Sequence, residues 1–322
     1  MTNRSESSSL GEFELIRRYF TPSHLPEQVL IGVGDDCAVL ALPAGEMLVV
    51  SVDTQLPAVH FPADAHPSDI ASRVLRCAAS DLAAMGATPL GFTLALTLPT
   101  IDEVWLAAFS SGLLETAQKL RCPLIGGDTT RGALCISIQV HGSVPAAKIL
   151  RRSGAQVGDQ VWVSGSVGDG AAALAFLEKR VEFSQQAEHY LQQRFYQPAV
   201  DFDFAVQLRA LASACIDVSD GLLADLAHIC TASGVGARIF CEALPIASVW
   251  RDSVTQQQAR QWVLSGGDDY RLCFTAPPQH SAALRVLDHV FCVGEIVAEH
   301  GVIACDAEHN LVELPANGFQ HF

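Results

Sequence analysis

The chain has 322 residues, of which 49% are hydrophobic and 17% are charged. This balance allows a sizeable core and excludes a disordered protein, and the length predicts two domains. The 35 acidic and 20 basic residues give a net charge of −15, which argues against binding to nucleic acid or to an anionic membrane. If so acidic a protein binds an anion such as a nucleotide, a cation must mediate, and the sequence favours a metal ion.

The N-terminal segment 1–11 lacks the apolar stretch of a signal peptide. The apolar stretch Leu90–Leu98 is too short to cross a bilayer. We therefore expect a cytoplasmic protein without a membrane partner. The 10 cysteines form no C-x-x-C pair, which favours buried, reduced thiols over a zinc site or a disulfide framework.

The first half of the chain predicts one mixed α/β unit. Its expected helices are Glu12–Phe20, Pro67–Met85 and Ile101–Leu120. Its expected strands are Val29–Val33, Ala38–Leu42, Met47–Ser51, Phe92–Leu98, Pro123–Ile125 and Leu134–Val144. Gly86 is a plausible C-cap of the second helix. The segment Val144–Gly154 interrupts the pattern, so we expect domains at residues 1–148 and 149–322.

The second half begins a new series of strands and helices. The expected strands are Gln160–Ser164, Cys215–Val218, Gly236–Phe240, Tyr270–Phe274 and Val290–Val297. A glycine-rich turn, Gly165–Gly170, opens a helix to about residue 180, and the later helices are Ala187–Arg194, Ala205–Leu211, Asp220–Thr231 and Gln256–Leu264. The order is not that of a doubly wound parallel sheet, so we expect an α/β fold of the α+β-like kind in both halves.

Aspartates beside glycine, serine or threonine at the edges of apolar strands are the strongest chemical signal. They are Asp35, Asp36, Asp53, Asp81, Asp128, Asp217, Asp220, Asp268 and Asp269. Each one alone is best explained as a turn or cap residue, but the repeated setting is not. Carboxylates that converge on one site repel each other unless a cation is present, and Mg²⁺ suits them because it takes oxygen ligands and bridges to phosphate.

The common nucleotide motifs are missing. The chain has three lysines and no G-K-[ST] sequence, which excludes a Walker A loop, and kinase H-R-D and D-F-G sequences are absent. Phosphate binding must therefore use Mg²⁺, glycine N–H groups and arginine. Arg152 in ILRRSG is the strongest arginine candidate, although a solvated surface role is equally consistent with its sequence. His60, seven residues after Asp53, is the candidate imidazole.

These segments, taken in chain order, resemble the thiamine-monophosphate kinase family, within the ATP-binding superfamily of aminoimidazole ribonucleotide synthetase and selenophosphate synthetase. The resemblance rests on GEFELIRRYF, GVGDDCAVL, SVDT, SDLAAMGATP, IGGDTTRG, RRSGAQVGD, IDVSDGL, LSGGDDYRLCF and the terminal GFQHF. It implies an N-terminal mixed-sheet domain for ATP, metal and dimerisation, a C-terminal α/β domain, and an active site in the cleft between them. It also implies a homodimer, for which Val29–Val33 and Leu134–Val144 are apolar enough to pair.

The resemblance also implies the activity and the roles of single residues. The activity is ATP-dependent phosphorylation of thiamine monophosphate to thiamine diphosphate, with several Mg²⁺ ions per site and ATP as co-substrate. Carried over by motif, the metal ligands are Asp36, Ser51, Val52, Asp53, Asp81, Asp128, Asp217 and Asp220. The ATP contacts are Gly127, Asp128, Arg152 and Ser219, and the substrate contacts are His60, Asp268 and Phe319. No general base is expected.

Three positions depart from the family pattern. Val52 stands where threonine is frequent, so a main-chain carbonyl would serve the metal there. Ala78 replaces a frequent asparagine. Asp268 replaces the glutamate of the usual GGED sequence, which shortens a substrate contact by one methylene and affects substrate geometry rather than reaction type.

Two alternatives stay open at this stage. One is another ATP-dependent enzyme of the superfamily, such as aminoimidazole ribonucleotide synthetase. A selenophosphate synthetase typically needs an N-terminal cysteine or selenocysteine with a lysine nearby, whereas the first cysteine here is Cys37 and the first lysine is Lys119. The other is a non-catalytic divalent-cation-binding protein, which is expected to carry D-x-D-x-D-G loops that the sequence lacks.

Overall fold

The computed structural model describes residues 11–308 and 310–312, and the chain forms two compact units. Within the described residues, the first unit comprises 11–44, 50–78 and 89–142. The second unit comprises 45–49, 79–88, 143–308 and 310–312. Among the described residues, no helix is both long and apolar enough to span a membrane.

The first unit is built on a four-stranded mixed sheet. The sheet has the order β3-β6-β4-β5, in which β4 and β5 are parallel. These strands are β3 (Glu46–Gln55), β4 (Thr88–Leu98), β5 (Leu124–Arg131) and β6 (Cys135–Pro145), and the short pair β1 (Val29–Ile31) and β2 (Val39–Leu40) forms a separate ribbon. The helices are α1 (Glu12–Tyr19), α2 (Pro67–Ala84) and α3 (Glu103–Leu120).

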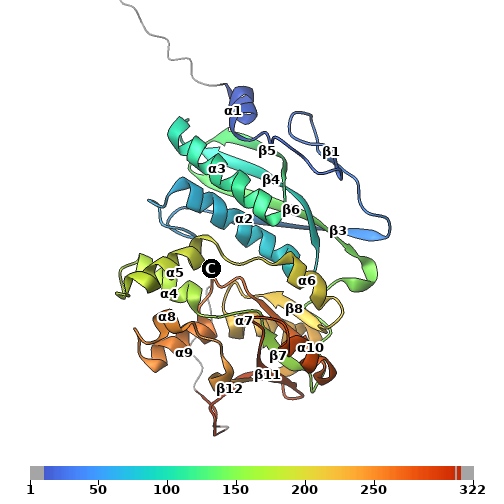
Figure 1. Cartoon of the computed structure of the whole chain (residues 1–322), viewed down its shortest axis with the longest axis vertical. Helices are drawn as coiled ribbons and strands as arrows, with labels where there is room; N and C mark the ends of the chain where they lie inside the picture. Colours follow the sequence, from blue (N-terminus) through green and yellow to red (C-terminus); the bar gives the residue numbers. More distant parts are fainter. Residues whose placement is uncertain (1–10, 309, 313–322) are drawn as a thin grey trace, which may run out of the picture. The chain divides into compact units, whose positions relative to one another are not determined.

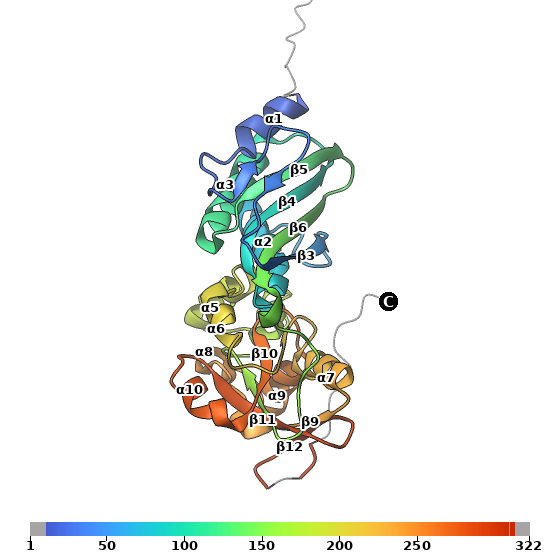
Figure 2. The same ribbon diagram turned by 90° about the vertical axis from the view of Figure 1, so that its right-hand side faces the viewer.

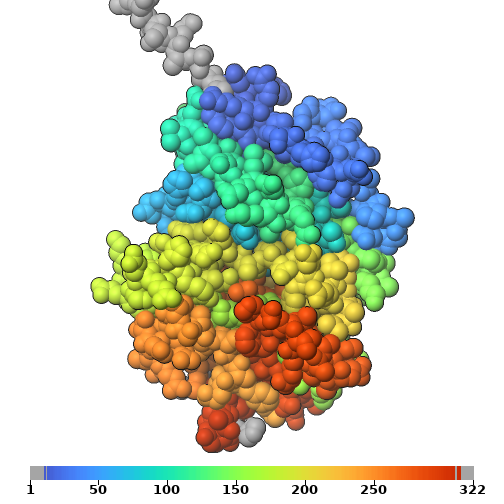
Figure 3. Space-filling view, in the orientation of Figure 1, coloured from blue at the N-terminus to red at the C-terminus, as the bar shows by residue number. Residues whose placement is uncertain are grey.

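Two helices cover one face of this sheet. In Figure 1 and Figure 2, α2 and α3 run side by side along it. Their apolar side chains, including Val74, Leu75, Leu106 and Phe109, are almost completely buried. Figure 3 shows α1 on the surface of this unit beside α3, where the rings of Phe20 and Phe109 meet edge to face at 6.5 Å. Among the described residues, Figure 2 shows no such helices along the opposite face of the sheet, which is called the open face below.

The second unit contains a six-stranded sheet of the order β12-β9-β11-β7-β10-β8. All its neighbouring pairs are antiparallel except β12 and β9, which are parallel. Its strands are β7 (Gln160–Val163), β8 (Ala214–Asp217), β9 (Gly236–Phe240), β10 (Leu272–Ala276), β11 (Phe291–Val297) and β12 (Gly301–Cys305). The mixed α/β fold expected from the sequence is therefore confirmed for both sheets.

Helices of the second unit pack on this sheet and on each other. They are α4 (Asp169–Leu177), α5 (Gln185–Tyr196), α6 (Phe202–Leu208), α7 (Leu222–Ser233), α8 (Ser248–Arg251), α9 (Gln256–Ser265) and α10 (Ser281–Arg285), with 3-10 turns η1 (Ala146–Lys148), η2 (Cys241–Ala243) and η3 (Pro278–His280). Helix α7 contacts β8, β9 and β12, and α4 packs against α5. Because α7 follows directly on β8, the loop between them lies at the carboxyl end of a buried strand.

Most expected elements form near their expected bounds, and the differences have physical causes. Strand β5 runs to Arg131, whereas the sequence indicated an end at Ile125, because its polar half Gly126–Arg131 pairs in parallel with β4. Strand β3 extends to Gln55 through alternation of exposed and half-buried residues. Helices α8 and α10 and strand β12 were not expected, because short elements carry too little periodicity to be recognised.

Candidate active site

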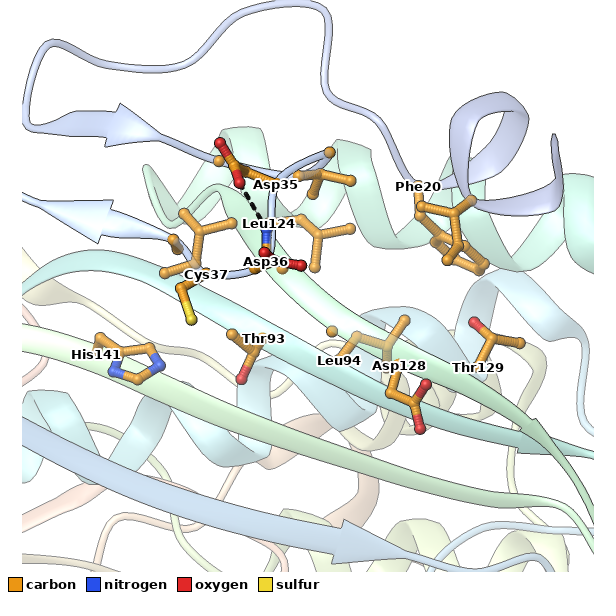
Figure 4. A pocket seen from close by; sticks show the side chains of 18 of the residues that line it. Phe20, Asp35, Asp36, Cys37, Thr93, Leu94, Leu124, Asp128, Thr129 and His141 are labelled. Carbon is orange, nitrogen blue, oxygen red and sulfur yellow. Dashed lines mark hydrogen bonds between the residues drawn. The ribbon is translucent and has the colours of Figure 1, made fainter. Parts of the chain in front are cut away.

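A pocket of about 760 Å³ lies on the open face of the first sheet. Its walls come from α1, from the loop between β1 and β2, and from β4, β5 and β6. Figure 4 shows Asp36 and Asp128 among its lining residues, and both are exposed. The structure therefore brings together two of the predicted metal ligands, one from a loop and one from a strand.

The loop that carries Asp36 is shaped by its own sequence. Gly34 has φ +118°, a conformation that glycine adopts without strain. The Asp35 Oδ1 atom accepts a hydrogen bond of 2.8 Å from the Asp36 N–H (Figure 4). Asp35 thus fixes the main chain at Asp36, and the Asp36 carboxylate remains at the pocket.

Gly127 lies next to Asp128 where β5 crowds β4. A Cβ atom at Gly127 would be 2.0 Å from the Leu94 carbonyl oxygen, and the residue has φ +152°. Any side chain at this position would push the two strands apart. Glycine is therefore required here by the packing, and it also lets a ligand approach the main chain of β5 closely.

His141 and Cys37 also line this pocket. The His141 Nε2 atom is buried without a hydrogen-bond partner, and burial lowers the pKa of this imidazole. Among the described residues, no group of three or more histidine, cysteine, aspartate or glutamate side chains is arranged to hold a metal ion. Three aspartates line the pocket, of which Asp35 accepts the Asp36 N–H, so Asp36 and Asp128 are the candidate ligands.

Strand β3 carries three further predicted ligands. Ser51 and Asp53 lie on its half-buried face, and the Val52 side chain, which is 60% exposed, lies on the other. None of the three is among the residues that line the pocket. A role for Val52 through its main-chain carbonyl stays a prediction.

His60 lies in the turn that follows β3. Its Nδ1 atom accepts a hydrogen bond of 3.0 Å from the Leu56 N–H, and its carbonyl oxygen accepts one of 2.9 Å from Arg73 Nε. Because Nδ1 is an acceptor, the neutral imidazole carries its proton on Nε2. The turn therefore fixes both the position and the tautomer of the predicted substrate contact.

Three loops meet in the second unit, and two of them carry predicted site residues. The three loops are the glycine-rich turn Gly165–Gly170, the loop 218–221 after β8, and the segment 266–271 before β10. The Asp268 N–H donates to the Ser219 carbonyl at 2.9 Å, and the Tyr270 N–H donates to the Val218 carbonyl at 2.8 Å. The structure thus brings Ser219, Asp220 and Asp268 into one neighbourhood.

Two buried carboxylates hold these loops in place. Asp225 Oδ2 accepts hydrogen bonds from the N–H groups of Ser219, Asp220 and Gly221 at 3.0, 3.0 and 3.2 Å. Asp269 accepts from the N–H groups of Gly168 and Gly170 at 2.6 and 2.9 Å. Burial raises the pKa of Asp225 to about 7, and it raises that of Asp269 to about 7, where the neighbouring Asp169 adds repulsion.

Asp169 is the centre of a buried polar network under the glycine-rich turn. Its carboxylate accepts hydrogen bonds from Ser166 Oγ and Tyr190 Oη, both at 2.6 Å, and from Trp250 Nε1 at 2.7 Å. Arg194 Nε lies 3.2 Å from the same carboxylate. This network supports the turn from below and is not exposed to a ligand.

Asp217 connects its loop to the end of α2. Its Oδ2 atom accepts a hydrogen bond of 2.8 Å from Ser80 Oγ, and the Asp217 residue is 6% exposed. Asp81 follows Ser80 directly in the chain. The structure therefore brings together the predicted ligands Asp81 and Asp217.

Arg152 lies elsewhere in the second unit. The Cys215 N–H donates to the Arg151 carbonyl at 2.8 Å, and Ser233 Oγ donates to the Arg152 carbonyl at 3.4 Å. Ser233 is the last residue of α7, so the Arg152 main chain lies at the opposite end of this helix from Ser219. The predicted ATP contact of Arg152 stays a prediction, and Phe319 lies outside the described residues.

Sequence reasoning missed Asp225 and Asp169, and it grouped Asp269 with residues that face a ligand. Asp225 lies in the apolar segment LLADLA, where a carboxylate needs a buried partner. Asp169 lies within the glycine-rich turn, and Asp269 follows the predicted substrate contact Asp268. The signal that could have found Asp225 was an acidic residue in the first turn of an apolar helix.

Comparison with known proteins identifies the family. Residues 34–144 match the model of the AIR synthase related protein, N-terminal domain, and residues 156–306 match that of the C-terminal domain. The thiamine-monophosphate kinase of Salmonella typhimurium is 44% identical over 319 residues, which are 97% of this chain and 98% of the relative.

Two solved structures share the fold over most of their length. The thiamine-monophosphate kinase of Stenotrophomonas maltophilia K279a has a TM-score of 0.82 and 41% identity, and the match covers 86% of this chain and 91% of that one. AaThiL complexed with AMPPCP and TMP has a TM-score of 0.78 and 27% identity, with coverage of 88% and 89%. The chain therefore belongs to the AIR synthase related proteins and, among them, to the thiamine-monophosphate kinase family.

Proposed function

We propose that this chain catalyses the ATP-dependent phosphorylation of thiamine monophosphate to thiamine diphosphate. The observation that carries the proposal is the pocket of the first unit, where Asp36 and Asp128 lie beside the glycine main chain of β5. Relatives named thiamine-monophosphate kinase match nearly the full length of the chain. AaThiL, a structural neighbour, was solved with AMPPCP, an ATP analogue, and with TMP.

The donor set of the pocket fits Mg²⁺ bound together with a nucleotide. Mg²⁺ is commonly held by one or two carboxylates, by substrate phosphates and by water, rather than by a cage of protein ligands. Asp36 and Asp128 supply such a pair, and the absence of a three-ligand cluster in the described part of the chain agrees with this mode. When bound, Mg²⁺ would neutralise charge on the phosphates.

We assign the predicted roles to the residues as two sets. In the first unit, the metal ligands are Asp36, Ser51, Val52, Asp53 and Asp128, with Gly127 at ATP and His60 at the substrate. In the second unit, Asp81, Asp217 and Asp220 are metal ligands, Ser219 and Arg152 contact ATP, and Asp268 contacts the substrate. Both sets serve one reaction, and more than one Mg²⁺ takes part.

The reaction needs charge neutralisation more than proton transfer. A phosphate monoester has a second pKa of about 6 and is already a nucleophile at neutral pH. Direct in-line transfer of the γ-phosphoryl group then depends on positioning and electrostatics, so no general base and no covalent intermediate are required. Aspartates, glycine N–H groups and arginine are residues suited to this task.

We further propose that the chain acts as a homodimer in the cytoplasm. Leu30 and Ile31 of β1 are 63% and 40% exposed, and Val50 and Val52 of β3 are 46% and 60% exposed. Apolar strand residues with this exposure are suited to packing against a second copy.

The experiment that tests the function measures ADP release with Mg²⁺ and ATP, with thiamine monophosphate, with thiamine and with neither. We expect release only with thiamine monophosphate, because thiamine lacks the phosphate acceptor. Asp128→Asn should lower turnover by about 100-fold or more, since it removes an anionic ligand with almost no change in volume. The matched control Asp288→Asn, at an exposed residue of the second unit, should keep wild-type turnover. Wild-type turnover of Asp128→Asn, or a robust rate with thiamine, would contradict the proposal.

A further inference from the structure

We propose that Asp225 is a positioning residue for the nucleotide and its metal. Its buried carboxylate holds the loop Ser219–Gly221 in the one shape that presents Ser219 and Asp220 to these ligands. The inference rests on the proposed function, which assigns Ser219 to ATP and Asp220 to Mg²⁺. Asp225 itself touches neither, because the residue is only 2% exposed.

The geometry is that of one acceptor under three consecutive donors. Asp225 Oδ2 accepts from the N–H groups of Ser219, Asp220 and Gly221 at 3.0 to 3.2 Å. With all three N–H groups turned towards Asp225, the main chain of the loop is fixed on its inner side. One oxygen atom that accepts three main-chain bonds restricts the loop, so the loop loses most of its freedom before a ligand arrives.

Asp225 acts on the loop and not only on the helix. Helix α7 begins at Leu222, and its N-cap residue Gly221 makes no side-chain cap bond. Two of the three donors, Ser219 and Asp220, precede the N-cap, so a simple helix cap does not account for their bonds to Asp225. An acceptor that only capped α7 would have no reason to reach the residues that carry the predicted ligands.

The rest of the loop is fitted to this arrangement. Gly221 has φ +119°, and a Cβ atom there would be 2.8 Å from the Ser265 carbonyl carbon. On the other side, the Ser219 carbonyl accepts the Asp268 N–H, and a Cβ atom at Gly267 would be 2.4 Å from the same carbonyl oxygen. The loop is therefore held on two sides: by hydrogen bonds to Asp225 on the side of α7 and by the segment 265–268 on the other side.

The test compares Asp225→Asn with Asp201→Asn. Asp201 is an exposed carboxylate that accepts one main-chain N–H, that of Phe204, at 2.9 Å at the start of α6, so its variant reports the general cost of weakening such a bond. The first readout is the affinity for AMPPCP in the presence of Mg²⁺, measured by calorimetry, which does not require turnover. The second is the KM for ATP, and the third is the melting temperature.

We expect Asp225→Asn to weaken Mg²⁺–AMPPCP binding and to raise the KM for ATP by about tenfold, because asparagine replaces one carboxyl oxygen with an NH2 group beside three N–H donors. Asp201→Asn should change both by less than about twofold. Equal binding by Asp225→Asn and wild type would overturn the proposal. So would a loss of melting temperature in Asp225→Asn with both constants unchanged, which is the result that a purely structural residue gives.

A further measurement on the wild-type protein keeps the proposal testable if Asp225→Asn does not fold. The amide hydrogens of Ser219, Asp220 and Gly221 should exchange slowly and as a group, because one carboxylate holds all three. Exchange at the rate of an unstructured peptide would overturn the proposal. If the proposed function is wrong, the wild type will not phosphorylate thiamine monophosphate. Amide hydrogen exchange and Mg²⁺–AMPPCP binding do not depend on that reaction, so they test the role of Asp225 separately.

Discussion

At the scale of single residues, identical sequence settings lead to different chemistry. Asp36 and Asp269 each end a Gly-Asp-Asp sequence next to an apolar strand. Asp36 is exposed at a pocket, whereas Asp269 is 1% exposed and accepts hydrogen bonds from Gly168 and Gly170. The sequence predicts that such aspartates matter, but the partner that decides between ligand binding and support lies about 100 residues away in the chain.

Asp269 gives a prediction on pH and stability. In the folded protein its pKa is about 7, mainly because of burial and also because of repulsion from Asp169, whereas its ordinary value is 3.8. Between about pH 4 and pH 7 the unfolded chain has released this proton and the folded chain retains it. As the pH rises through this window, the free energy of unfolding therefore decreases by on the order of 4 kcal/mol at most. Above the window, Asp269 causes no further change with pH.

The variant Asp269→Asn cannot titrate, so its melting temperature should decline less between pH 4 and pH 7 than that of the wild type. Thermal scans across this range measure the difference in slope. Asp288→Asn, at an exposed position, serves as the control and should keep the wild-type profile. Parallel profiles of Asp269→Asn and wild type would show that the Asp269 carboxyl does not hold a proton in the folded state.

At the scale of elements, the sequence predicts helices better than strands. Helix α3 has a start signal in Asp102 at its N-cap and a basic residue, Lys119, in its last turn, and its expected end at Leu120 is confirmed. Strand β5 ends in Gly126–Arg131, which has low strand propensity, and only pairing with β4 extends it. The predicted ligand Asp128 therefore lies within a strand, a position that local sequence cannot reveal.

Helix α3 provides a prediction on stability alone. Asp102 Oδ1 accepts hydrogen bonds from the N–H groups of Val104 and Trp105 at 2.9 and 3.1 Å. Asp102→Ala should cost about 1 kcal/mol of stability and lower the melting temperature by about 2–4 °C. Turnover should not change, because Asp102 is no part of the pocket or of the three loops. Asp64→Ala, an exposed position outside any helix, is the control; an equal loss in both variants would show that capping is not the cause.

At the scale of the whole molecule, the motifs of the sequence are divided between two compact units. Asp36 and Asp128 line a pocket in the first, and Ser219, Asp220 and Asp268 meet in the second. The order of motifs predicts the family because it samples nearly the entire chain. The buried supports under these loops, such as Asp225, could not be predicted, because they follow from packing between segments that are separate in the sequence.

The last prediction concerns the assembly of two copies. In the sheet of the first unit, β3 is an edge strand, and its residues Leu48, Val50 and Val52 are 49%, 46% and 60% exposed on one face. Burying a valine side chain stabilises an assembly by about 1.5–3 kcal/mol, and a two-fold interface buries the same valine in each of the two copies. Light scattering at micromolar concentration should therefore find twice the chain mass of 34.4 kDa.

Val50→Asp should shift this species to 34.4 kDa, because each copy would bring an unpaired carboxylate into an apolar interface. The control is Val286→Asp, which introduces the same charge at a residue that is 79% exposed and follows α10 in the second unit; it should keep the mass of the wild type. A wild-type mass of 34.4 kDa would rule out the dimer at this concentration. A dimer that persists in Val50→Asp would instead place the interface away from this face of β3, since an interface there would bury both new carboxylates without partners.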